Sequence, residues 1–197
     1  KKGIAMPSLT DDSLYLCALS ENEGQNKAGL KRVYTKNDMS TGSLLATHLW
    51  VGDYAKYDGN GSVKDFEALA KSAGGIERLA VMRADVDNLG ATFIAGFDKE
   101  FATLSRYAAL SRQLSLFFKY HINDLCNRKT GGDGDEANRT FEIWRAEPSK
   151  TGREMAIVYS GGDDMFVVGA WDDVLGLSVD LYEAFKRYSC GKLTLSA

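Results

Sequence analysis

The sequence predicts an α+β protein whose larger part is a ferredoxin-like palm, an antiparallel sheet with helices on one face. Polymerase palms and many nucleotidyl cyclases are built on this arrangement. Two observations support the prediction. From Leu79 onward, apolar runs of strand length and long amphipathic patterns follow the order strand, helix, strand, strand, helix, strand. The two middle strands, residues 155–159 and 165–169, are separated by a glycine- and aspartate-rich segment that is typical of a hairpin turn.

Composition agrees with a globular protein and excludes some functions. The chain has 197 residues, of which 44% are hydrophobic and 26% charged, enough for one domain and part of a second. The formal net charge of −3 gives no general basic surface for nucleic acid, although neighbouring subunits can supply one. No signal-peptide pattern and no apolar run near the roughly 18 residues of a membrane span are present. We therefore expect a cytoplasmic protein with no membrane contact.

Residues 1–75 are expected to form the tail of a small α+β domain and a connector. Short apolar segments at 13–19 and 44–52 predict strands. The pattern at 64–73 predicts a helix that ends at a glycine pair. Residues 76–197 then form the palm. The chain has no initiating Met and ends on LTLSA, the middle of a predicted strand, as expected of a piece of a longer polypeptide.

The palm opens with a strand at 79–86, and a long helix follows. Its apolar stripe has three- and four-residue spacing and comprises Leu104, Tyr107, Ala108, Leu114, Phe117, Phe118, Ile122 and Leu125. Ser111 falls on this stripe. The polar, glycine-rich run at 126–155 predicts a surface insertion, and its acidic run at 133–136 is expected to be solvated loop.

A second amphipathic helix is predicted for residues 171–188, and LTLSA closes the palm with a strand. Asp172 or Asp173 can cap the start of this helix. Its expected buried stripe is Trp171, Val174, Leu175, Leu181, Tyr182, Phe185 and Tyr188.

Two acidic stretches carry the functional prediction. RADVDNLG ends the first palm strand, and GGDD forms the hairpin turn. In a ferredoxin-like sheet the first strand is central and lies beside the middle hairpin. We therefore expect Asp85, and with it Asp87, to lie close to Asp163 and Asp164.

Clustered carboxylates repel one another and raise each other's pKa values unless a cation lies between them. Mg²⁺ commonly takes one or two carboxylates, waters and substrate phosphates, so Asp85, Asp163 and Asp164 predict a site for Mg²⁺ or Mn²⁺. Two ions about 3.5–4 Å apart would stabilise both oxygens of a nucleotidyl transfer. Asp163 and Asp164 are thus the predicted catalytic residues.

Nucleotide-binding positions are predicted around these carboxylates. Gly161 and Gly162 allow a tight turn and leave room for phosphates. The amides of Asn88, Leu89 and Gly90 offer a second phosphate cradle. On the long helix, Ser105 and Ser111 either face a base-binding pocket or bond back to the carbonyl four residues earlier. GGD alone is a frequent turn without chemistry, but its pairing with DVDNLG on matching palm elements is much more specific.

These motifs resemble one family. RADVDNLG, LSRYAALSRQLSLFF, VYSGGDDMFVVGAWD and LTLSA are similar to the second palm domain of the large subunit of type III-A CRISPR effector complexes, over about residues 50–197. The resemblance implies a synthetase that converts ATP into 3′–5′ cyclic oligoadenylates when target RNA binds. It implies that Asp163, Asp164 and Asp85 bind the metal ions, and that Ser105 or Ser111 contacts adenine.

The resemblance also implies partners: other subunits of the complex, guide RNA, target RNA and a first palm domain that is missing from this chain. Two rival functions remain. A GGDEF-type diguanylate cyclase reads guanine with an Asn eight residues after its strand-end Asp, where this chain has Phe93. An inert palm acting as a scaffold would not need to keep Asp85, Asp163 and Asp164.

Overall fold

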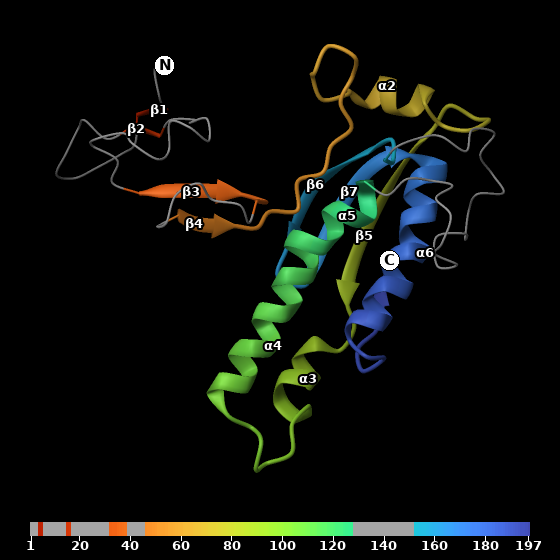
Figure 1. Ribbon diagram of the computed structural model, residues 1–197. Coiled ribbons are helices and arrows are strands. Elements are labelled where there is room, and N and C mark those ends of the chain that lie inside the picture. The colour runs from red at the N-terminus through yellow and green to blue at the C-terminus, as the bar shows by residue number, and fades with distance from the viewer. Residues whose placement is uncertain (1–3, 6–14, 17–31, 39–45, 128–151) are drawn as a thin grey trace, which may run out of the picture. The chain divides into compact units, whose positions relative to one another are not determined.

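The computed structural model describes residues 4–5, 15–16, 32–38, 46–127 and 152–197 (Figure 1). The chain divides into two compact units, Lys1–Leu49 and Trp50–Ala197. Most of the predicted strand at 13–19 and of the predicted insertion at 126–155, with its acidic run at 133–136, lies outside the described residues.

The described residues of the first unit form two strand pairs. Strands β1 (Ile4–Ala5) and β2 (Tyr15–Leu16) pair antiparallel, and β3 (Val33–Lys36) pairs in parallel with β4 (Ala46–Leu49). Strand β4 lies within the strand predicted at 44–52.

The second unit is built on a four-stranded antiparallel sheet in the order β6-β7-β5-β8. Its strands are β5 (Leu79–Val86), β6 (Met155–Gly161), β7 (Asp164–Ala170) and β8 (Leu195–Ser196). The first palm strand, β5, lies between the hairpin strand β7 and the last strand, as a ferredoxin-like fold requires. The predicted α+β palm is confirmed.

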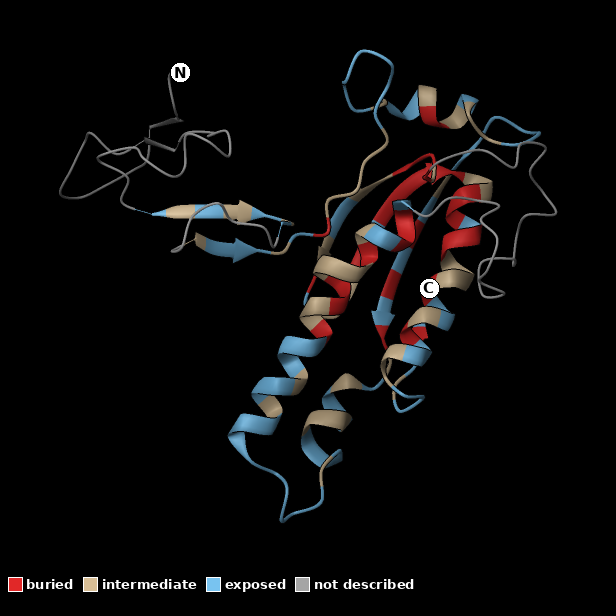
Figure 2. Ribbon diagram, in the orientation of Figure 1, coloured by how far each residue is buried: buried red, intermediate tan, exposed pale blue. Residues whose placement is uncertain are grey.

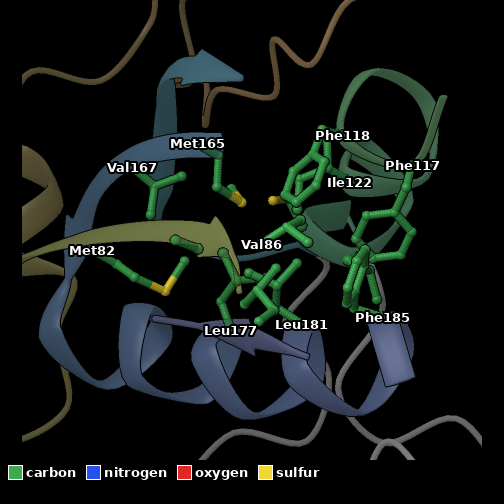
Figure 3. Close-up of a cluster of buried hydrophobic side chains, with 14 of the residues drawn as sticks. Met82, Val86, Phe117, Phe118, Ile122, Met165, Val167, Leu177, Leu181 and Phe185 are labelled. Carbon is green, nitrogen blue, oxygen red and sulfur yellow. The ribbon is translucent and has the colours of Figure 1, made fainter. Parts of the chain in front are cut away.

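Helices cover one face of this sheet. The long helix consists of α4 (Leu104–Leu116), a π-helical turn η1 (Phe117–His121) and α5 (Ile122–Asn127), and α6 (Trp171–Tyr188) packs on β5 and β7. Between sheet and helices lies the core, which includes Met82, Ala84, Val86, Phe117, Phe118, Ile122, Met165, Val167, Leu177, Leu181 and Phe185 (Figure 3). No helix in the described part of the chain has the length and apolarity of a membrane span.

The apolar stripe of the long helix is buried only over its second half. Leu114 and the apolar residues after it are buried, whereas Leu104 is 85% exposed and Ser111 is exposed (Figure 2). The reason is that the first turns of α4 extend past the end of the sheet, together with α3 (Leu89–Ala95), so no strand lies under them (Figure 1). The expected burial of the first half is therefore wrong.

Helix α6 also departs from its predicted details. Leu177 is buried and aligns with Val174 and Leu181 toward the sheet, whereas Leu175 and Tyr182 are 47% and 40% exposed on the flank. The helix begins after Ala170 without a side-chain cap. Asp172 and Asp173 instead accept long-range hydrogen bonds from the amides of Gly74 (3.1 Å) and Glu154 (2.8 Å).

Residues 50–75 belong to the same compact unit as the palm. The Asn123 side chain accepts hydrogen bonds from the amides of Asp53 and Tyr54, both at 3.0 Å. Helix α2 (Phe66–Lys71) packs against β7 and β5. Just before it, Lys64 Nζ lies 2.7 Å from the buried carboxylate of Glu154. A buried carboxylate needs such a partner, and the ion pair fixes this segment on the palm.

We expect Phe118→Ala to lower the free energy of unfolding by about 3–5 kcal/mol, because Phe118 is fully buried and packs against Phe117 and Phe185. Urea unfolding followed by circular dichroism measures the change. The exposed Phe66 provides the control, and Phe66→Ala should change it by less than about 0.5 kcal/mol. Equal effects of the two substitutions would contradict the assignment of the core.

Candidate functional site

The pairing of β5 with β7 brings two of the predicted carboxylates together. Asp85 stands directly opposite Asp164 in the register, and Gly161 stands opposite Asp164 on the other side. Directly opposed residues of antiparallel strands share one face, with Cβ atoms about 4.5–5.5 Å apart. Met82, Ala84 and Val86 alternate with Asp85 and face the core, so the carboxylates lie on the opposite face of the sheet, where Asp85 is exposed.

The turn itself consists of Gly162 and Asp163. Gly161 is the last residue of β6, which corrects the expectation that the two glycines form the turn. Gly162 has φ +30°, a value that favours glycine. The Asp163 carbonyl accepts a hydrogen bond from the amide of Val86 at 3.2 Å. This bond holds the turn beside the end of β5.

Asp87 contacts a different strand. Its carboxylate accepts hydrogen bonds from Ser196 Oγ at 2.6 Å and Thr194 Oγ1 at 2.7 Å. These two bonds, that of Ser196 first, lower the pKa of Asp87. Asp87 thus joins the end of β5 to β8 and the residue before it, and these hydrogen bonds are with Thr194 and Ser196 rather than with the turn.

The predicted phosphate cradle lies at the start of α3. Asn88 has the left-handed φ of 54°, and Leu89 and Gly90 form the first helical turn, whose amides have no acceptor within the helix. Ser105 and Ser111 are both exposed on α4, and Ser105 Oγ lies 3.1 Å from Thr103 Oγ1. The ring of Tyr107 on α4 contacts Phe93 of α3 and Phe97, which follows α3.

Two neighbours of Asp164 were not among the predicted site residues. Arg83 Nη2 lies 3.9 Å from Asp164 Oδ2. Tyr159 hydrogen-bonds to Asp164, and this bond raises the pKa of the phenol. The signal was available in the sequence, because Arg83 precedes Asp85 by two residues and Tyr159 precedes Gly161 by two, so each pair shares a strand face.

The carboxylates of Asp85, Asp163 and Asp164 suit an ion such as Mg²⁺, which takes further ligands from water and substrate. Among the described residues, no three His, Cys, Asp or Glu side chains are gathered closely enough to hold a metal by themselves. Asp85 and Asp164 supply two carboxylates on one face, with Asp163 in the adjacent turn. Mg²⁺ commonly binds one or two carboxylates and completes its shell with waters and substrate phosphates. Oxygen donors alone also suit Mn²⁺.

The family described as "Cas10/Cmr2, second palm domain" matches residues 78–197. The chain belongs to this family. A palm-containing relative from Mycobacterium tuberculosis, named CRISPR system single-strand-specific deoxyribonuclease Cas10/Csm1 (subtype III-A), is 41% identical over 201 residues, which cover 100% of this chain and 23% of the relative. A relative of the same name from Streptococcus thermophilus is 39% identical over 181 residues, covering 89% of this chain and 20% of its own length.

Solved structures agree with this assignment of the palm. A Csm1–Csm4 cassette in complex with cA4 has a TM-score of 0.69 and 32% identity, and the match covers 84% of this chain and 22% of that one. The cassette in complex with one ATP has a TM-score of 0.68 and 34% identity, with the same coverage. The resemblance inferred from the motifs is confirmed. The chain spans between 20% and 23% of the length of the two curated relatives, so it corresponds to one part of them.

We expect Asp87→Ala to increase amide hydrogen exchange in β8 severalfold and to leave the β6–β7 hairpin unchanged. The substitution removes both side-chain bonds that hold residues 194–196 on the end of β5. Hydrogen exchange followed by mass spectrometry measures the two regions separately. Unchanged protection of β8 would show that the backbone pairing alone holds this strand.

Proposed function

We propose that this palm carries the metal-binding half of an ATP-using nucleotidyltransferase that makes 3′–5′ cyclic oligoadenylates within a target-RNA-activated type III-A CRISPR complex. The observation that carries the proposal is the direct pairing of Asp85 with Asp164 beside the glycine turn. The ATP- and cA4-bound Csm1–Csm4 structures, which share this fold at 32–34% identity, support the choice of nucleotide.

The proposed reaction joins two ATP molecules. The 3′-hydroxyl of one ATP attacks the α-phosphate of another, a bond forms between that oxygen and phosphorus, and pyrophosphate leaves. Asp85, Asp163 and Asp164 hold Mg²⁺ or Mn²⁺, which when bound stabilises the attacking and leaving oxygens. Repetition and a final attack within the chain close the ring.

The remaining predicted residues bind and orient ATP. Gly161 and Gly162 present no side chains at the turn, so phosphates can approach its backbone. The free amides of Leu89 and Gly90, after the left-handed Asn88, can donate to phosphate oxygens. Ser105 and Ser111 remain the two candidates for the contact with adenine.

We propose that other parts of the complex complete the site. A first palm domain would contribute the second ATP-binding surface, and other subunits, such as the Csm4 that accompanies Csm1 in the solved structures, would place the palm beside guide and target RNA in the cytoplasm. The relatives from Mycobacterium tuberculosis and Streptococcus thermophilus are named as deoxyribonucleases. That activity belongs to those whole proteins, and the described residues here give no separate support for it.

The surroundings of Phe93 argue against the rival function, a diguanylate cyclase. Phe93 occupies the position at which the GGDEF class carries its guanine-reading Asn, and its ring stacks on Tyr107 with centroids 6.2 Å apart. A phenyl ring in this packing neither donates to nor accepts from guanine. The position therefore favours ATP over GTP.

We expect the double substitution Asp163→Ala and Asp164→Ala in the assembled complex to abolish oligoadenylate formation while leaving target-RNA binding nearly unchanged. The reason is that the proposed role of these carboxylates is to hold metal and not to recognise RNA. Chromatography of products from labelled ATP and Mg²⁺ measures the first effect, and a gel-shift assay the second. Asp124→Ala, an exposed aspartate on α5, serves as control and should retain full synthesis. Undiminished rings in the double variant would overturn the metal assignment.

We expect the complex to bind ATP at least about tenfold more tightly than GTP, a difference of about 1.4 kcal/mol. Displacement of a fluorescent ATP analogue measures both affinities. One of the variants Ser105→Ala and Ser111→Ala should reduce this preference, while the other serves as its matched control on the same helix. Equal affinity for the two nucleotides would favour the diguanylate cyclase instead.

A further inference from the structure

Asp164 is surrounded on this face of the sheet by side chains from three strands. Asp85 of β5 and Gly161 of β6 stand directly opposite it. Arg83 and Tyr159 both pair with Phe166, two residues further along β7, so they are its diagonal neighbours on the same face. Long and aromatic side chains can reach across such a diagonal.

The Tyr159 side chain lies over Gly161, between its own position on β6 and Asp164 on β7. A Cβ atom placed on Gly161 would lie 3.0 Å from the Tyr159 hydroxyl oxygen and 3.3 Å from its Cζ. The phenol thus occupies the space in which a side chain at Gly161 would stand. Because Gly161 stands directly opposite Asp164, the Tyr159 hydroxyl that lies over Gly161 is beside Asp164. A hydrogen bond to that carboxylate raises the pKa of the phenol.

The two diagonal neighbours differ in what they do for the carboxylate. Arg83 is exposed and its Nη2 lies 3.9 Å from Asp164 Oδ2, so water and salt screen its attraction. The Tyr159 hydroxyl can instead donate a directed hydrogen bond to the carboxylate. A carboxylate has about four acceptor positions, so one bond from a phenol leaves others for a metal ion.

We propose that Tyr159 is a positioning residue, whose hydroxyl holds the Asp164 carboxylate beside Asp85 in the orientation that binds the divalent ion. This inference rests on the proposed metal site. Outer partners of metal ligands typically change metal affinity by about 10–100-fold.

The test measures Mn²⁺ binding without nucleotide, by electron paramagnetic resonance, in the full-length subunit that contains this palm. Asp163→Ala with Asp164→Ala defines the ions bound elsewhere, and the difference from the unmodified protein gives the affinity of this site. We expect Tyr159→Phe to weaken that affinity about tenfold, because it removes only the hydroxyl. The loss should persist at high ionic strength, where a purely electrostatic contribution would fade.

The matched control is Tyr182→Phe on α6, an exposed tyrosine outside the candidate site, which should leave Mn²⁺ binding unchanged. Circular dichroism of both variants checks that the fold is kept. Equal Mn²⁺ affinity of Tyr159→Phe and the unmodified protein would overturn the positioning role alone. Equal Mn²⁺ binding by the double aspartate variant and the unmodified protein would instead overturn the proposed metal site, and the inference with it.

Discussion

The register between β5 and β7 is the constraint on which the rest of the palm depends. Side chains alternate along a strand, so the same pairing that puts Asp85 opposite Asp164 also puts Ala84 opposite Met165 in the core. A slip of one residue would turn the carboxylates inward and expose the core side chains. The hydrophobic core therefore fixes the site: burial of Met82, Ala84 and Val86 determines that the carboxylates share the opposite face.

Contacts around the hairpin hold the turn on that register. Ser160 Oγ donates to the carbonyl of Phe118, in the π-helical turn of the long helix. A π-helical turn interrupts the regular hydrogen-bonding pattern, and such turns are frequent near functional sites. On the other side, the Val86 amide donates to the carbonyl of Asp163. The turn is thus tied to one helix and to the central strand, which limits its motion relative to Asp85.

The sequence predicts the bounds of strands and helices that depend on local periodicity. It does not predict burial or hydrogen bonds that depend on an element distant in the chain. Strand β5 and helix α6 have the predicted bounds because their apolar patterns are regular over several turns or pairs. The predicted burial of the first half of α4 was wrong, because an apolar stripe on a helix does not indicate how far the sheet extends beneath that helix. The role of Asp173 was also wrong, since its partner, the Glu154 amide, follows an insertion that no local pattern positions. Tyr159 was missed although it lies two residues before Gly161, because the pairing that brings it beside Asp164 joins two different strands.

The repulsion between the carboxylates of Asp85 and Asp164 bears on whether this palm binds metal or serves only as a scaffold. Like charges directly opposite each other in a sheet are destabilising, and a palm used only as a scaffold would be more stable with one of them replaced. Arg83 and the Tyr159 hydroxyl offset part of this repulsion at Asp164. Arg83 is screened by solvent and the phenol carries no charge, so neither neutralises both carboxylates. A divalent cation does, and the exposed face leaves room for it and for the phosphates that would complete its shell. Binding of an ion and its nucleotide, as proposed above, would relieve the repulsion built into this register.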